Sequence, residues 1–148
     1  MTPKTPSNNW QDRAEATLTA AGHNRGGARR ALLDLLAQQT CALTAIEIED
    51  TLRSKRRVSR ASVYRILDEL ERLGLVQRVE TGQAMVRYER IDDQHEHHHH
   101  LVCERCGLIM PFSDDDLERA IKRLSRRVPL EVSEHDIVLR GACAECRL

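Results

Sequence analysis

The fold of the first half of this 148-residue chain is decided by residues 58–90, VSRASVYRILDELERLGLVQRVETGQAMVRYER. Ser59 can cap the free backbone N–H groups at the start of a helix, and Val58 can pack on Val63 across its first turn. The apolar residues that recur at helical spacing mark one buried face, namely Val63, Ile66, Leu67, Leu70 and Leu73. Gly74 suits the left-handed residue that ends a helix. The stretch therefore opens with a predicted amphipathic helix.

Two strand-like runs, 75–80 and 85–90, follow this helix and are joined by a turn at 81–83. The helices predicted upstream run from Trp10 to before Gly22, from Ala28 onward after a loop at His23–Gly27, and from a Thr44–Glu47 capping box to about Leu52. Three helices and a hairpin predict a winged helix-turn-helix with an extra helix in front. This first domain covers residues 1–90, and we expect its first nine residues to be disordered.

The basic residues of this domain are concentrated just before and within the predicted recognition helix. The formal net charge of the chain is zero, which by itself argues against nucleic-acid binding, but residues 53–65 carry six basic residues and no acidic one. The second helix of a helix-turn-helix enters the major groove with its N-terminal end. The candidate DNA contacts are Arg57, Arg60, Ser62, Tyr64 and Arg65. They could equally be ordinary solvated residues, but the basic loop and the hairpin favour DNA.

Composition bounds the class of protein. The chain is 41% hydrophobic and 31% charged, as expected of a soluble globular protein. It has no apolar run approaching the ~18 residues of a membrane-spanning helix and no signal-peptide pattern. We therefore expect a cytoplasmic protein without a membrane partner. Thiols stay reduced there, so the five cysteines favour metal ligands over disulfides.

A second, smaller domain is predicted over residues 97–148, after a polar hinge at 91–96. Its elements are a strand at 97–103, a return strand at 108–112, a helix capped by Ser113 with Asp116, and a last strand at 130–140. The apolar side of that helix comprises Leu117, Ile121, Leu124 and Val128. The fold class is therefore α+β, with a small α/β domain after the winged helix.

Paired cysteines are the strongest chemical signal. Cys103 and Cys106 form one C-x-x-C pair, and Cys143 and Cys146 form another. Zinc prefers four soft ligands in a tetrahedron, and a site with four protein ligands is structural because no coordination position stays open. Four unrelated buried cysteines or a redox pair are the weaker interpretations. The pattern predicts one structural zinc ion.

A histidine run precedes the first cysteine pair. Side chains alternate across a strand, so His97 and His99 should point to one face and His98 and His100 to the other. One strand can then supply two different metal sites. A solvated polar strand is the alternative.

Taken together, these motifs resemble the ferric uptake regulator (Fur) family of metal-dependent bacterial repressors. The resemblance covers nearly all of the chain from about residue 20. It rests on Ala61–Arg65, His97–Leu101 with Cys103-x-x-Cys106, Phe112–Asp115, and Gly141-x-Cys143-x-x-Cys146. It implies a winged-helix domain joined by a hinge to an α/β dimerisation domain, and a homodimer that binds palindromic double-stranded operators when metal is loaded.

Carried over residue by residue, the resemblance implies three metal sites. The four cysteines match the structural zinc site. A site within the dimerisation domain matches His97, His99, Glu118 and His135, with His99 where many members have aspartate. The regulatory hinge site matches Glu89, His98 and His100, but Ala42 and Pro111 replace two of its ligands, and Cys41 is the candidate substitute. Among the DNA contacts, the resemblance adds Arg29.

The predicted function is therefore a non-enzymatic, metal-responsive repressor without a small-molecule substrate. We expect zinc to be sensed, as in the zinc uptake branch, rather than iron (Fe²⁺) or manganese (Mn²⁺). Peroxide sensing within the same family and zinc storage or delivery without DNA binding are the alternatives. A zinc deaminase is disfavoured, because the chain lacks the Pro-Cys-x-x-Cys motif and its second cysteine pair would close the site.

Overall fold

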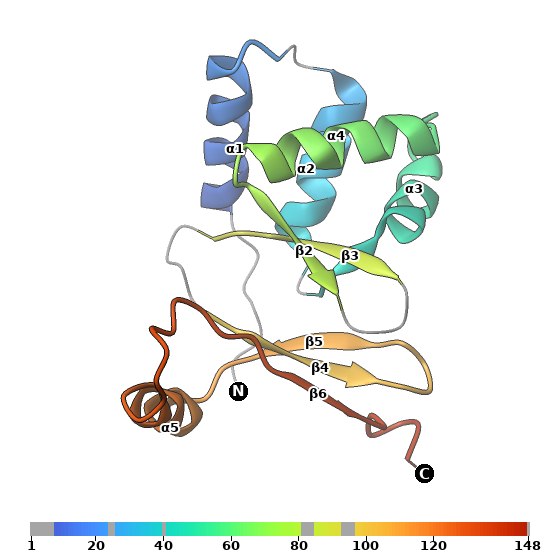
Figure 1. The fold of residues 1–148 in the computed structure, drawn as a ribbon. Coiled ribbons are helices and arrows are strands. Elements are labelled where there is room, and N and C mark those ends of the chain that lie inside the picture. The colour runs from blue at the N-terminus through green and yellow to red at the C-terminus, as the bar shows by residue number, and fades with distance from the viewer. Residues whose placement is uncertain (1–7, 24–25, 40, 81–84, 93–96, 148) are drawn as a thin grey trace. The chain divides into compact units, whose positions relative to one another are not determined.

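The computed structural model describes residues 8–23, 26–39, 41–80, 85–92 and 97–147. The chain forms two compact units, one spanning Thr5–Glu96 and one containing His97–Leu148, which are described separately (Figure 1). The turn predicted at 81–83 and most of the hinge at 91–96 lie outside the described residues. Of the residues 1–9 predicted to be disordered, 1–7 also lie outside them, but Asn8 and Asn9 belong to the first helix.

Four helices make up most of the first unit: α1 (Asn8–Ala20), α2 (Gly27–Gln38), α3 (Ala45–Arg53) and α4 (Arg60–Arg72). The predicted start of α4 is confirmed, because the Ser59 Oγ accepts a hydrogen bond from the Ser62 N–H at 3.1 Å. Its predicted end is confirmed by Gly74, whose φ is +70°. The capping box before α3 is also present, with Thr44 and Glu47 bonded to each other in both directions. The helix-turn-helix therefore begins at the Thr44 cap of α3 and ends at Gly74 after α4, and both boundaries are set by residues of the local sequence.

The wing is a three-stranded sheet in the order β1-β3-β2. Strands β2 (Val76–Glu80) and β3 (Val86–Arg90) are the predicted antiparallel pair. Strand β1 (Leu43–Thr44) was not predicted, and it pairs antiparallel with β3 at Tyr88 and Arg87. Thr44 thus ends a strand and caps α3, so the wing is attached to the helix-turn-helix by its own backbone.

Helix α1 belongs to the core of this unit. Trp10 is only 1% exposed, and its Nε1–H donates to the Leu75 carbonyl at 3.0 Å. Its neighbours in the buried cluster include Leu33, Ile48 and Tyr88 from three other elements. The extra helix therefore fastens the segment that joins α4 to the wing.

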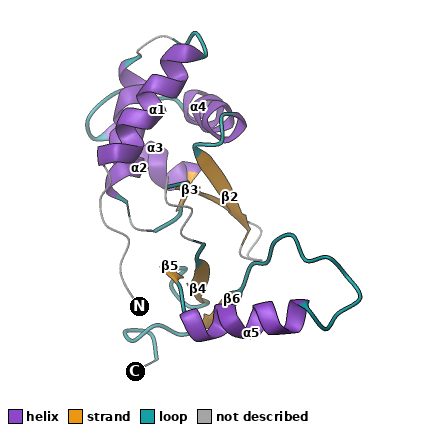
Figure 2. Cartoon of the chain, turned by 90° about the vertical axis from the view of Figure 1, so that its left-hand side faces the viewer, coloured by secondary structure: helices purple, strands orange, loops and turns teal. Residues whose placement is uncertain are grey.

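The second unit is a three-stranded sheet with one helix (Figure 2). Its elements are β4 (His99–Cys103), β5 (Ile109–Phe112), α5 (Asp115–Ser125) and β6 (Val138–Gly141), and the strand order is β5-β4-β6. Strand β4 is central, antiparallel to β5 and parallel to β6. The predicted α+β class, with a winged helix followed by a small mixed domain, is confirmed.

Three local predictions in this unit need correction. The cap of α5 is Asp114, which accepts from the Leu117 N–H at 2.8 Å, and not Ser113. The last strand is 138–141 rather than the predicted 130–140, because β4 offers pairing partners only to that shorter stretch. Strand β4 begins at His99 rather than His97.

Within the described residues, the apolar side of α5 is only partly covered: Leu117 and Ile121 are half-buried, and Val128 lies beyond the end of the helix. None of the helix residues is buried, and Leu124 is 57% exposed. The described part of the chain has no helix that meets the length and hydropathy needed to cross a membrane.

Candidate metal centres and nucleic-acid interface

The four predicted zinc ligands come together at one end of the second sheet, and we call them the four-cysteine cluster. Cys103 ends β4, and the tight turn after it, with Gly107 at φ +76°, brings Cys106 back beside it. Parallel pairing of Cys103 with Gly141 then delivers the turn that carries Cys143 and Cys146. The four sulfurs lie within 4.8 Å of one another, with 3.8 Å between those of Cys106 and Cys143.

The surroundings of these thiols lower the pKa of Cys103 and raise the pKa values of Cys106 and Cys146. Backbone N–H groups of Cys143 and then Cys106 point at the Cys103 sulfur and lower its pKa to about 6. Hydrogen bonds with the sulfurs of Cys143 and Cys106 raise the pKa of Cys146 to about 12. A divalent cation would replace the remaining thiol protons, and four converging soft ligands with no open position fit Zn²⁺.

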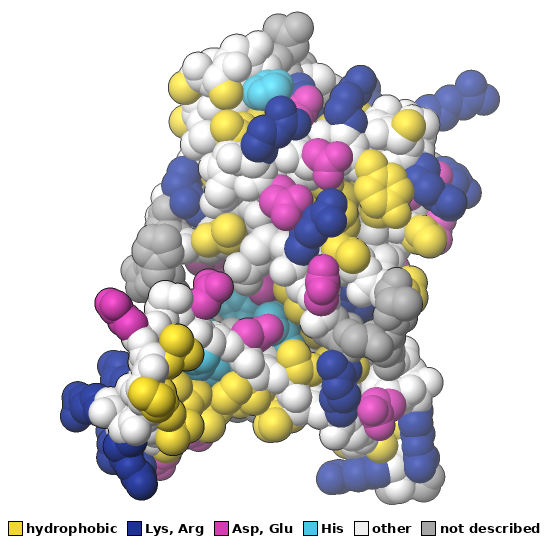
Figure 3. Space-filling view, viewed as in Figure 1, with side chains coloured by type: hydrophobic (Ala, Val, Ile, Leu, Met, Phe, Trp, Pro, Cys, Tyr) yellow, Lys and Arg dark blue, Asp and Glu magenta, His cyan; other side chains and the backbone are white. Residues whose placement is uncertain are grey.

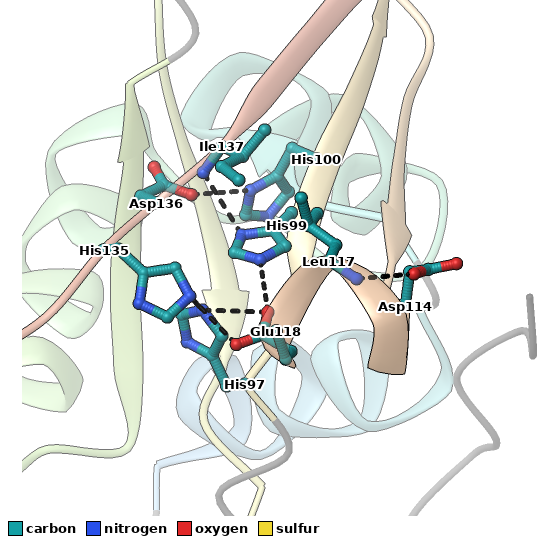
Figure 4. A network of polar contacts seen from close by, with 9 residues as sticks. All are labelled: His97, His99, His100, Asp114, Leu117, Glu118, His135, Asp136 and Ile137. Carbon is teal, nitrogen blue, oxygen red and sulfur yellow. Dashed lines mark hydrogen bonds and ion pairs between the residues drawn. The ribbon is translucent and has the colours of Figure 1, made fainter. Parts of the chain in front are cut away.

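A second cluster joins β4, α5 and the segment before β6 (Figure 4). The ligand atoms of His97, His99, Glu118 and His135 lie within 4.8 Å of one another. The Glu118 carboxylate is central: its Oε1 lies 2.7 Å from His99 Nε2, and its Oε2 lies 3.0 Å from His135 Nε2. His97 Nε2 lies 3.0 Å from His135 Nε2. Three imidazoles and one carboxylate are a donor set suited to zinc or another first-row divalent metal.

The electrostatics of this cluster keep it ready for a cation. Burial raises the pKa of Glu118, but the hydrogen bond from His99 and the charge of His135 outweigh it, so the net pKa is lowered. Burial, followed by repulsion from His135 and His99, lowers the pKa of His97. Glu118 is therefore ionised and His97 neutral at neutral pH, and these are the forms that bind metal.

The residues predicted for the hinge site fall on both units. Glu89 lies on β3, where it is 6% exposed and accepts from the Gln77 side chain of β2. Cys41 lies half-buried between α2 and β1. His98 and His100 belong to the second unit, with ring centroids 5.1 Å apart. The hinge site itself stays a prediction.

The predicted recognition helix presents its N-terminal half to solvent. Tyr64 is 42% exposed, and Arg65 is exposed beside it. Arg57 is exposed in the preceding loop, and Ser62 is half-buried next to the cap. This exposed surface has the groups that DNA binding needs, namely cationic side chains and a helix N-terminus.

Two of the predicted DNA contacts are engaged by acidic residues that the sequence analysis missed. Arg60 Nε donates to Glu49 Oε2 at 2.8 Å, and Arg53 donates to the other oxygen of Glu49 at 2.6 Å. Arg29 on α2 pairs with Glu69 on α4. Glu49 is buried, and only the crossing of α3 and α4 brings it to Arg60. No local sequence pattern indicates the pairs Arg60–Glu49 and Arg29–Glu69, because each joins two different helices.

These features define a class: winged-helix proteins with a separate metal-binding unit that carries a four-cysteine cluster. The sequence model described as "Ferric uptake regulator family" matches residues 21–140. The chain belongs to the ferric uptake regulator family. It is therefore a metal-responsive DNA-binding transcriptional regulator of a dimeric family and not an enzyme, so the deaminase interpretation is dropped.

Individual relatives match over most of their length. The ferric uptake regulation protein of Helicobacter pylori is 28% identical over 137 residues, covering 92% of this chain and 90% of the relative. That of Neisseria meningitidis serogroup B is 30% identical over 138 residues, covering 89% and 92%.

Solved structures give the same result. The H. pylori regulator superposes with a TM-score of 0.84 at 27% identity, covering 98% of this chain and 97% of that one. The Vibrio cholerae regulator superposes with a TM-score of 0.76 at 30% identity, covering 89% and 100%.

Proposed function

We propose that the chain is a cytoplasmic, zinc-sensing repressor that binds a palindromic operator as a homodimer. The observation that carries this proposal is that one unit contains two groups of candidate metal ligands with different donor atoms. The four-cysteine cluster has four sulfur donors and no open position, as a structural site requires. The His97, His99, Glu118 and His135 cluster is partly exposed, which suits a metal that exchanges with the cell.

The sensed metal is proposed from the donor atoms. Nitrogen donors outnumber carboxylates in the second cluster. At the predicted hinge site, Ala42 and Pro111 stand where ligands are expected, which leaves Glu89, His98 and His100, with Cys41 as a substitute. Small sets rich in nitrogen and sulfur favour four-coordinate zinc over six-coordinate iron or manganese. The H. pylori relative is described as having three functional metal binding sites, which supports a third site here.

A dimer is supported by the uncovered apolar surface of the second unit. Leu124, Leu130 and Leu139 are 57%, 71% and 52% exposed. Hydrophobic side chains gather at the α5 end of this unit, beside Lys and Arg side chains (Figure 3). Such a patch is unusual on a monomer and typical of an interface.

The test is metal-titrated DNA binding, measured by fluorescence anisotropy with operator DNA and a scrambled duplex. We expect zinc to raise operator affinity at lower free concentration than Fe²⁺ or Mn²⁺. His98→Ala/His100→Ala should abolish this response if the hinge site is the switch. His97→Ala/His99→Ala is the matched pair on the same segment. If only this second pair abolishes the response, the switch lies in the second unit and the hinge assignment is wrong.

A further inference from the structure

Glu49 and Arg60 form an ion pair that runs from the interior of the first unit to its surface. Glu49 lies on α3 with only 7% of its side chain exposed, whereas Arg60 is the first residue of α4 with 56% exposed. The Arg60 Nε–H donates to Glu49 Oε2 at 2.8 Å. The pair can form because α4 begins beside α3 (Figure 1). A buried acid therefore holds a cation that reaches solvent at the start of the predicted recognition helix.

The Glu49 carboxylate is itself held from a second side. Its Oε1 accepts a hydrogen bond from Arg53, one turn later on α3, at 2.6 Å. Each carboxylate oxygen thus has an arginine donor, and the carboxylate cannot rotate without losing one of these charge-assisted hydrogen bonds. A fixed acceptor confines the long Arg60 side chain, which would otherwise lose its rotamer freedom only on binding a partner.

The hydrogen bond to Glu49 uses only one of the three nitrogens of the Arg60 guanidinium. Among the described residues, Nε has this partner and the two terminal amino groups have no hydrogen bond. The guanidinium is planar, and its N–H donors point in fixed directions. Anchoring Nε therefore leaves the terminal amino groups, at the tip of the side chain, as a preoriented pair of donors.

This donor pair lies where a helix-turn-helix reads bases. The N-terminal residues of the second helix contact base edges in the major groove. Tyr64, which is 42% exposed, follows Arg60 one turn later on the same side of α4. Two parallel N–H donors match the O6 and N7 acceptors of guanine, and no other base presents two acceptors side by side in the major groove.

We propose that Arg60 reads a guanine in each operator half-site through its two terminal amino groups, and that Glu49 is the positioning residue that holds Arg60 for this contact. The contact contributes to discrimination between bases more than to total affinity, because Glu49 already offsets the charge of Arg60. A wrong base sets the fixed donors against an amino or methyl group. This inference rests on the proposed function, because it assumes an operator with two half-sites.

The experiment selects duplexes from a random library with the full-length, zinc-loaded protein. The affinity of the selected duplex is then measured with each G·C pair changed to A·T. We expect one symmetric pair of guanines at which the change costs the wild type ~5-fold per half-site. Replacing that guanine by 7-deazaguanine removes only the N7 acceptor and should also weaken wild-type binding.

Arg60→Lys tests the base contact without changing the net charge. The single nitrogen of lysine cannot present a planar pair of donors while it is bound to Glu49. Arg60→Lys should therefore lose the preference for this guanine, become insensitive to 7-deazaguanine, and keep the base preferences at all other positions of the selected duplex.

Variants at position 49 test the positioning role. Glu49→Met removes both oxygens but keeps a buried side chain of similar length, so circular dichroism should show a folded protein. Its guanine preference should fall from ~5-fold to below ~2-fold. Glu49→Asp keeps the charge but withdraws the carboxylate by one methylene, and its preference should fall between those of Glu49→Met and the wild type. Asp50→Asn removes an exposed acid from the same helix and should match the wild type.

The possible failures are distinguishable. If Arg60→Lys keeps the guanine preference, or weakens binding to all duplexes equally, Arg60 contacts the backbone or nothing, and the inference is overturned. If the full preference persists in whichever of Glu49→Met and Glu49→Asp folds, Glu49 does not position Arg60. If the wild type enriches no duplex at all, the operator binding in the proposed function is overturned as well.

Discussion

At the scale of single residues, Glu49 has an unusual position: it is a buried acid beneath the recognition helix. The hydrogen bond from Arg60 lowers its pKa below the ordinary value of 4.5, and Arg53 adds to this against the opposing effect of burial. Glu49 therefore offsets two cations of the basic stretch 53–65, one of which, Arg60, is a predicted DNA contact. It also ties α3 to the first residue of α4.

Glu49→Gln tests this contribution through pH. A carboxylate with a depressed folded-state pKa stabilises the fold above its unfolded pKa, and the contribution disappears as pH falls through the folded pKa. Wild type should therefore be more stable than Glu49→Gln at pH 7, and the gap should close below about pH 4.5. Urea denaturation at several pH values measures the difference in unfolding free energy between the two proteins. Asp50→Asn, which removes an exposed charge on the same helix, is the control, and a gap independent of pH would refute the argument.

Arg65 and Arg60 should differ in their contribution to DNA binding. Arg65 is exposed, whereas Arg60 already donates to Glu49. Arg65→Ala should weaken operator binding roughly ten-fold and reduce the slope of log affinity against log salt by about one. Arg60→Ala should have a smaller effect on both the operator affinity and the salt dependence. Equal affinities for wild type and Arg65→Ala at matched salt would show that this helix does not contact DNA.

At the scale of elements, the two cysteine turns should be needed for the second unit to fold. Cys103→Ser should lose about one equivalent of zinc and much of the thermal stability, because a structural metal contributes folding energy directly. Zinc content by atomic spectroscopy and melting by circular dichroism measure both. Cys41→Ser is the control and should keep the zinc. A stable, zinc-free Cys103→Ser protein would disprove the structural role.

The helices and strands differ in how well the sequence alone predicts them. Helix α4 was predictable because its cap, its apolar face and Gly74 all agree within one segment. Strand β1 was not, since two residues carry no periodicity and its pairing depends on where β3 lies. The strand predicted at 130–140 was too long because a strand extends only as far as its neighbour.

The candidate metal sites also combine features that local sequence predicts with features that depend on the tertiary fold. The four-cysteine cluster follows from sequence spacing, and strand alternation correctly grouped His97 with His99 although His97 lies just before β4. The bond from Ile137 to His99 depends on the parallel register of β4 and β6, which no local pattern encodes. Residue types could therefore name the members of the cluster but not the backbone contact that orients the His99 ring.

At the scale of the whole molecule, the uncovered leucines of the second unit should control assembly. Leu124→Asp puts a charge on the exposed apolar side of α5 and should convert the dimer to a monomer in light scattering. Two linked recognition helices bind far more tightly than one, so operator affinity should fall at least ~100-fold. Ile46→Asp, an exposed apolar position on α3, should remain dimeric. A dimeric Leu124→Asp protein would place the interface elsewhere.

The parallel pairing of β4 with β6 also has a consequence for synthesis on the ribosome. Every strand partner of the first unit has emerged by Arg90, so the winged helix can fold while the rest of the chain is still being translated. The central strand β4 has to wait for Val138–Gly141, and the cysteine cluster for Cys146. A nascent chain stalled before Cys143 would therefore display a finished winged helix with neither its zinc nor its complete second sheet. Translational arrest in this interval would release a DNA-binding fold beyond the reach of metal control.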